Sequence, residues 1–142
     1  MKKIQVAVMA GLISFFAVDG IAGEVQPVPL EVDLVNMFAL GDQATARFSD
    51  NDVEHIGCGI RTIDDGVNPF FEWGFCQAND ATGEFIACFT ENPDLIRAIY
   101  AISDFSFITF KWQDDGIGGA ECTQIGSSNQ SFYIPGFFKL QN

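Results

Sequence analysis

The four cysteines constrain the fold of this chain more than any other feature of its sequence. They are Cys58, Cys76, Cys88 and Cys122. Successive cysteines are 18, 12 and 34 positions apart, whereas zinc sites usually contain thiolates about two to four residues apart. An even number of cysteines in a small exported chain predicts two disulfides rather than a metal site or a reactive thiol. We therefore expect neither a metal nor a cofactor.

The amino-terminal residues have the pattern of an export signal. Two lysines precede an apolar run of fifteen residues, Ile4–Val18, and the small-residue segment Gly20–Gly23 follows it. This order of a basic, an apolar and a small-residue part is typical of a signal peptide. A membrane anchor is the alternative, but it needs roughly 20 apolar residues. We predict a signal peptide over residues 1–23 and a secreted or periplasmic mature chain without a membrane anchor.

The predicted mature chain is small and acidic. Removal of the signal peptide leaves 119 of the 142 residues, which is near the commonest domain size. We expect residues 24–30 to form an extended leader and residues 31–142 to form a single domain. The mature chain has 5 basic and 18 acidic residues, a formal charge of −13. This charge excludes nucleic acid as a partner, because phosphate contacts need clustered Lys and Arg.

The middle of the chain predicts a three-stranded antiparallel meander. Three segments rich in β-branched or aromatic residues are separated by the turn sequences DDGVNP and ANDATG. They span residues 53–63, 70–77 and 84–90. If the turns centre on the middle of these two sequences, Cys58 opposes Cys76 and Cys76 opposes Cys88. Three cysteines then lie on one face of the sheet.

Strand spacing limits how these cysteines can pair. Neighbouring strands lie about 4.8 Å apart and alternate strands about twice as far, whereas bridged Cα atoms lie less than about 7 Å apart. A Cys58–Cys88 bond is therefore disfavoured. The remaining pairings are Cys58–Cys76 with Cys88–Cys122, which we prefer, and Cys76–Cys88 with Cys58–Cys122.

The segment TENPDLIRAIYAIS after the meander predicts a helix of about ten residues. Asn92 is suited to cap this helix, and Pro93 is favourable in its first turn. Leu95, Ile99 and Ile102 form its apolar stripe. We expect this helix to cover the sheet.

The remaining segments predict further strands. Residues 104–113 and 120–126 flank the turn sequence DDGIGG and predict a hairpin. Residues 31–40 and 44–50 predict an additional strand pair, or a short helix in the first of them. The predicted fold class is α+β, in which an antiparallel sheet of meander plus hairpin packs against one short α-helix and contains two disulfides.

The face opposite the cysteine row is rich in aromatic residues. It holds Gly57, Gly59, Arg61, Phe71, Trp73, Phe75, Phe85, Ala87 and Phe89. A soluble monomer rarely exposes so large an apolar surface, so we expect the helix, the segment Leu34–Leu40 or a second copy to cover most of it. The uncovered margin around Arg61, Phe71 and Trp73 is the candidate binding surface. A guanidinium beside an indole there could bind a protein or a carbohydrate partner.

Catalytic signatures are scarce in this sequence. His55 is the one side chain that titrates near neutrality, and no G-x-S-x-G or comparable nucleophile motif accompanies it. The many carboxylates contain no pair that stands out from the others. We therefore predict a non-enzymatic binding or structural module. The alternative is a small secreted hydrolase that uses His55 or a carboxylate pair.

Overall fold

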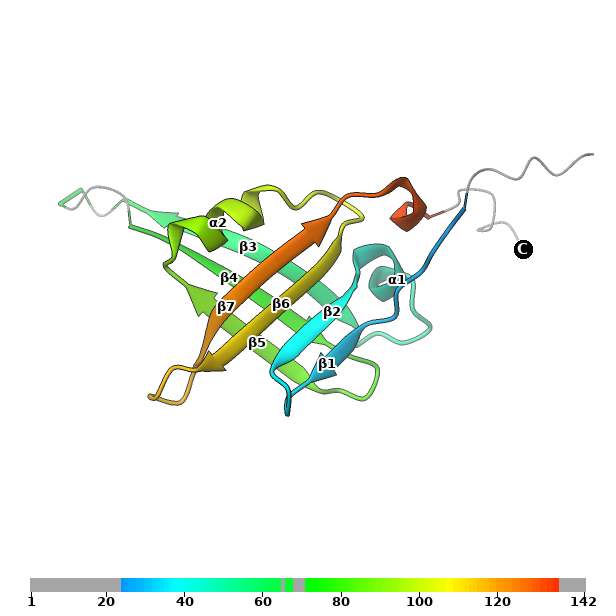
Figure 1. Cartoon of the computed structure of the whole chain (residues 1–142), viewed down its shortest axis with the longest axis horizontal. Coiled ribbons are helices and arrows are strands. Elements are labelled where there is room, and N and C mark those ends of the chain that lie inside the picture. The colour runs from blue at the N-terminus through cyan, green and yellow to red at the C-terminus, as the bar shows by residue number, and fades with distance from the viewer. Residues whose placement is uncertain (1–23, 65, 68–70, 136–142) are drawn as a thin grey trace, which may run out of the picture.

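The computed structural model describes residues 24–64, 66–67 and 71–135, and Figure 1 shows strands crossing one another with two short α-helices beside them. The strands are β1 (Glu31–Asp33), β2 (Phe38–Asp42), β3 (His55–Ile63), β4 (Phe71–Asn79), β5 (Phe85–Thr90), β6 (Phe107–Asp114) and β7 (Ala120–Ser128). The helices are α1 (Gln43–Arg47), α2 (Pro93–Tyr100) and the 3₁₀ helix η1 (Ser131–Tyr133). The predicted signal peptide lies outside the described residues.

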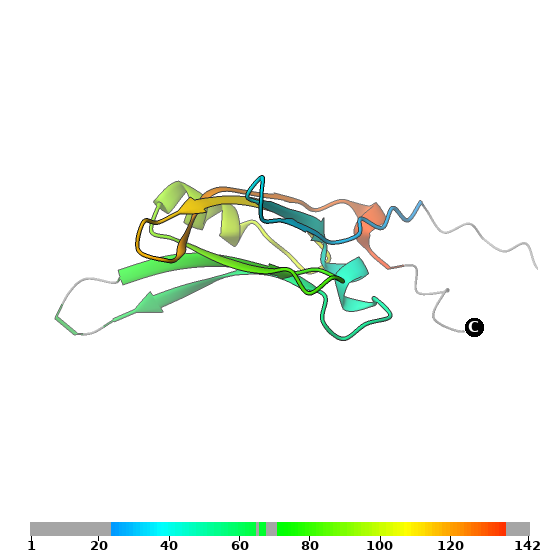
Figure 2. The same cartoon turned by 90° about the horizontal axis from the view of Figure 1, so that it is seen from below.

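The strands form one sheet that folds over into two layers. The strand order is β1-β2-β6-β7-β5-β4-β3. Figure 2 shows β3, β4 and β5 in one layer and the other four strands in the second layer. Neighbouring strands are antiparallel except β5 and β7, which are parallel and share one residue pair, Phe89 with Glu121. The two layers are therefore joined through a narrow junction.

The predicted fold class is confirmed only in outline. The described chain is mostly β-structure with two disulfides, and α2 lies in the predicted segment. The sheet is mixed rather than antiparallel, and α1 is a second helix. The difference arises because the β6–β7 hairpin places its second strand beside β5. Strand β7 then runs in the same direction as β5, which local sequence patterns do not indicate.

The predicted register of the meander is confirmed. Cys58 opposes Cys76 across β3 and β4, and Cys76 opposes Cys88 across β4 and β5. The disulfides are Cys58–Cys76 and Cys88–Cys122, which is the preferred pairing. The first bond links adjacent strands within one layer, and the second links β5 to β7 across the junction of the layers.

The cysteine row faces the core between the two layers. Cys76, Ala78 and Cys88 have no exposed surface. Phe110 and Ile108 of β6 belong to the same buried cluster and are also fully buried. Small side chains on one layer thus leave room for large side chains from the other, which gives the close packing of a protein interior.

Helix α2 begins as its capping residues predict. The Asn92 Oδ1 atom accepts a hydrogen bond of 2.9 Å from the Asp94 N–H group, and Pro93 is the first helical residue. This cap satisfies one of the N–H groups that the first turn of a helix leaves without a partner. The helix ends at Tyr100 after eight residues rather than about ten.

Helix α2 packs on the cysteine face of the sheet. Of the predicted stripe, Ile99 is buried and Leu95 and Ile102 are partly buried, and Ile96 is buried as well. The helix approaches the sheet closely at Gly74 of β4, where a Cβ atom would lie 2.5 Å from the Cδ1 atom of Ile99. The helix can pack on this face because Gly74 has no side chain. The expectation that the helix covers the aromatic face is therefore wrong.

The segment before the meander forms a hairpin and a helix. Residues 31–40 contain β1 and most of β2, which pair with each other. The strand predicted over residues 44–50 is wrong, because this segment starts inside α1. The Asp42 Oδ1 atom caps this helix by accepting a hydrogen bond of 2.7 Å from the Thr45 N–H group. The other carboxylate oxygen of the buried Asp42 accepts a hydrogen bond of 2.6 Å from the Val28 N–H group, which ties the leader to β2.

We predict that the Cys88–Cys122 bond contributes more stability than the Cys58–Cys76 bond. The strands joined by Cys58–Cys76 already pair at nine positions, whereas β5 and β7 pair at one. The Cys88–Cys122 bond also closes the longer loop, 34 against 18 residues. Replacing Cys88 and Cys122 by Ala should lower the free energy of unfolding by about 2–4 kcal/mol, because loop closure restricts the unfolded chain.

Urea denaturation of the two double variants measures this difference, and the Cys58→Ala, Cys76→Ala variant is the matched control. The control should lose less stability, since its strands remain paired along their length. A larger loss in the control than in the Cys88→Ala, Cys122→Ala variant would contradict the importance of the inter-layer bond.

Candidate binding surface

The outer face of β3, β4 and β5 points away from the core. Its aromatic side chains are Phe71, Trp73, Phe75, Phe85 and Phe89, and the register also places His55, Arg61, Ile63 and Gln77 on this face. Phe71, Phe85 and Phe89 expose 46%, 53% and 49% of their surface. Trp73 and Phe75 are half-buried. Within the described chain, neither α2 nor the segment Leu34–Leu40 covers this face, because α2 and the second layer pack on the opposite face. Cover by a second copy of the chain, the third alternative, stays a prediction.

Phe75 and Arg61 form the part of the outer face that lies over β3. Gly59 opposes Phe75, and a Cβ atom on Gly59 would lie 2.8 Å from the Cζ atom of the Phe75 ring. The ring therefore lies across the glycine. The guanidinium carbon of Arg61 lies 5.0 Å from the centroid of the same ring, within the range of a cation–π contact. Arg61 opposes Trp73 in the register, as predicted, but its charge lies over Phe75.

Trp73 connects the aromatic residues of β4 and β5. Its ring centroid lies 5.8 Å from that of Phe75 and 5.6 Å from that of Phe89. The corresponding interplanar angles are 47° and 54°. These distances are typical of favourable aromatic pairs. The three rings thus form one continuous cluster, but they are tilted and do not make a flat platform.

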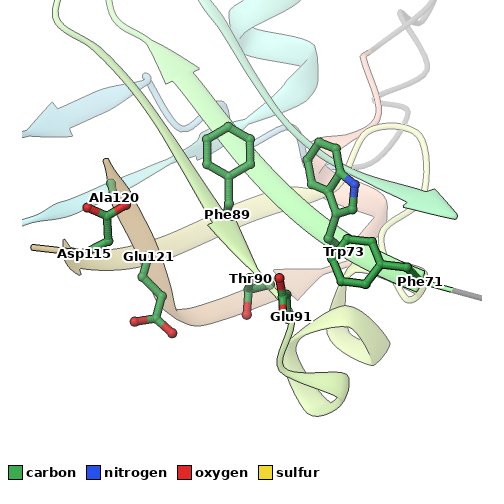
Figure 3. Close-up of a pocket in the computed structure, with 8 residues that line it drawn as sticks. All are labelled: Phe71, Trp73, Phe89, Thr90, Glu91, Asp115, Ala120 and Glu121. Carbon is green, nitrogen blue, oxygen red and sulfur yellow. The ribbon is translucent and has the colours of Figure 1, made fainter. Parts of the chain in front are cut away.

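An open groove of about 480 Å³ adjoins this cluster at the junction of β5 and β7. It is lined by Phe71, Trp73, Phe89, Thr90, Glu91, Asp115, Ala120 and Glu121. Figure 3 shows the rings of Phe71 and Trp73 on one side and the carboxylates of Asp115 and Glu121 on the other. Two of the three predicted surface residues, Phe71 and Trp73, line this groove, whereas Arg61 does not.

The acidic residues of the groove were not predicted as site residues. Glu91 follows β5, Asp115 lies in the β6–β7 turn and Glu121 lies on β7. The parallel pairing of Phe89 with Glu121 brings these segments to the end of the aromatic cluster. The sequence DDGIGG indicated a turn, which the structure confirms, but nothing in it indicated a position beside Phe89.

The groove carries negative charge, and its described lining residues include no basic side chain. The N–H groups of Ile117 and Gly119 donate hydrogen bonds of 2.9 and 2.8 Å to the Asp115 Oδ1 atom, and these bonds lower the pKa of its carboxyl group. The Glu121 Oε2 atom accepts a hydrogen bond of 3.0 Å from the neutral amide of Gln113. None of the basic side chains in the described part of the chain lines the groove.

His55, the alternative catalytic residue, is exposed at the start of β3. Its Nδ1 atom lies 3.0 Å from the carbonyl oxygen of Val53, and its ring centroid lies 6.1 Å from that of Phe85. His55 lines a hollow of about 410 Å³, and Asp52 and Glu54 line it as well. Within the residues that the structure describes, no carboxylate is hydrogen-bonded to the imidazole. A catalytic triad orients its histidine through an acidic partner, whereas the partner of His55 among the described residues is the Val53 carbonyl oxygen.

The described residues contain no other feature that identifies a function. Among residues 24–64, 66–67 and 71–135, no group of three or more histidine, cysteine or acidic side chains could hold a metal ion. In the same ranges, no helix has the length and apolar character needed to cross a bilayer. No protein-family model matches the chain, and neither the curated proteins nor the solved structures provide a significant match.

We predict that Phe89→Ala and Phe110→Ala differ strongly in stability. Phe110 is fully buried, so its truncation should leave a cavity and lower the free energy of unfolding by about 3–5 kcal/mol. Phe89 is 49% exposed, so the same truncation should lower it by only about 1 kcal/mol. Urea denaturation of the oxidised proteins measures both values. Equally large losses would show that Phe89 is covered in solution.

Proposed function

We propose that this chain is a non-enzymatic module that binds a protein partner through the outer face of β3, β4 and β5. The observation that carries the proposal is the exposure of Phe71, Phe85 and Phe89 on one face of the sheet. Large contiguous apolar patches on soluble proteins mark interaction surfaces. Aromatic side chains also provide much of the binding energy at protein interfaces.

The geometry of the rings favours a protein over a carbohydrate partner. The Trp73 ring is tilted by 47° and 54° against its two aromatic neighbours. A sugar chain lies best on rings that share one plane, whereas irregular aromatic surfaces fit the side chains of a protein. The groove beside Trp73 and Phe89 adds a concave site for such a side chain.

The proposed compartment is secreted or periplasmic. Two disulfides link the chain, and no free cysteine occurs among the described residues. Disulfides persist in oxidising compartments and are rare in the cytosol. The amino-terminal export signal predicted from the sequence supports the same location.

The alternative function, a small hydrolase that uses His55 or a carboxylate pair, has less support. His55 is exposed and its Nδ1 atom contacts a backbone carbonyl oxygen. General base catalysis by histidine commonly depends on a partner that fixes the orientation of the ring. We therefore place this function second.

Selection of random displayed peptides on the immobilised, oxidised chain tests the proposal. We expect peptides that bind the wild-type chain and bind the Phe89→Ala variant at least about tenfold more weakly, because central aromatic residues dominate interface energies. The matched control is Phe48→Ala. Phe48 is 54% exposed and lies at the end of α1, outside the outer face. Binding to this control should equal binding to the wild type.

Two results would contradict the proposal. Peptides that bind the wild type, Phe89→Ala and Phe48→Ala variants equally would show that the outer face is not the binding surface. A hydrolytic activity of the wild type that is lost in a folded His55→Ala variant would favour the alternative.

A further inference from the structure

The groove at the β5–β7 junction combines apolar surface with negative charge. Three of its lining residues are aromatic and three are acidic. Phe89, at its centre in Figure 3, is 49% exposed, so the aromatic part is accessible to a partner. The carboxylates of Glu91 and Glu121 are exposed as well. A ligand that fits this groove has to match both properties at once.

The negative charge of the groove is not neutralised within the described chain. The basic residues of that part of the chain are Arg47, Arg61, Arg97 and Lys111, and none of them lines the groove. The ion pair in the described part of the chain joins Arg97 to Asp94 on α2, and neither residue lines the groove. Like charges gathered without counter-charges attract a cationic partner and repel an anionic one.

The outer face already holds one basic side chain on an aromatic ring. The Arg61 guanidinium carbon lies 5.0 Å from the centroid of Phe75. Phe75 belongs to the same ring cluster as Trp73 and Phe89, which line the groove. This surface is thus able to hold a guanidinium at its β3 edge, and the groove offers similar rings at its β5 edge with carboxylates added.

We infer that the groove receives an arginine or lysine side chain from a basic segment of the partner protein. The long aliphatic part of such a side chain can pack on Trp73 and Phe89, while its charged end lies near the carboxylates. Cation–π attraction and charge attraction then act together. This inference rests on the proposed function, namely that the outer face binds a protein.

Charge complementarity also distinguishes this occupant from a second copy of the chain. The formal net charge of the whole chain is −12. Two copies meeting at the groove would bring acidic surfaces together, which is unfavourable. A basic segment is attracted at long range and therefore also gains in association rate.

Three synthetic peptides of one sequence test the inference by titration calorimetry with the oxidised chain. The peptides are acetyl-Ala-Phe-Arg-Ala-Arg-Phe-Ala-amide and its versions with citrulline or glutamate in place of arginine. We expect the arginine peptide to bind at least about tenfold more tightly than the citrulline peptide, which has a similar shape without the charge. The difference should shrink between about 50 and about 300 mM salt, because exposed charges are screened.

A pair of charge variants locates the effect. Glu91→Gln combined with Glu121→Gln should weaken binding of the arginine peptide about tenfold and leave the citrulline peptide unchanged. The matched control, Glu31→Gln with Glu84→Gln, removes two exposed carboxylates that do not line the groove. It should leave binding of both peptides near the wild-type value. Asp115 is kept in both variants because its carboxylate holds the β6–β7 turn.

The results separate this inference from the proposed function. Equal binding of the arginine and citrulline peptides, weakened by Phe89→Ala, would overturn the inference and leave the proposed function in place. Equal losses in the two charge variants would also overturn the inference, since the attraction would then be unspecific. Absence of binding by the arginine peptide overturns the inference, and absence of any Phe89-dependent peptide from the displayed library overturns the proposed function as well.

Discussion

The Cys88–Cys122 disulfide joins the two layers of the sheet where the backbone itself provides one residue pair. Both cysteines are buried, and the core around them combines small side chains with large ones. On β4, the small Gly74 leaves room for Ile99 of α2. The small Ala78 belongs to the same buried cluster as the large Phe110 of the second layer. Because side chains alternate along a strand, burial of this small-residue row directs the neighbouring aromatic residues outward. The orientation of the outer face is therefore a consequence of how the core is closed.

The same junction creates the groove. Strand β7 lies parallel to β5 at Phe89, and this places Glu121 and the Asp115 turn beside the aromatic cluster. The outer face thus changes in character across its width. Arg61 lies over Phe75 at the β3 edge, tilted rings occupy the middle, and carboxylates lie at the β5–β7 edge. This gradient of charge is the physical basis for expecting a partner that combines apolar and basic side chains.

The sequence predicted local structure well and the larger arrangement less well. The meander register followed from turn positions, which are local constraints. Strand spacing argued against a Cys58–Cys88 bond and left two pairings, of which the preferred one is present. The helix cap at Asn92 followed from side-chain chemistry. Which face of the meander is buried depends on packing with a hairpin far along the chain. The usual tendency to bury aromatic residues pointed to the wrong face, although the small size of Gly74, Cys76 and Ala78 was a usable signal.

The position of the acidic residues in the groove depends on the parallel β5–β7 pair, and no local sequence pattern indicates that pair.

In this fold the cysteine row of β3, β4 and β5 faces inward and the aromatic row faces outward. Hydroxyl-radical footprinting of the dilute, oxidised chain, with modified residues identified by mass spectrometry, tests this arrangement most directly. Phe85 and Phe89 are 53% and 49% exposed, so both should be oxidised readily, whereas the fully buried Phe110 should be protected. Protection of Phe85 and Phe89 to the same degree as Phe110 would contradict the account, because the aromatic face would then be part of the core.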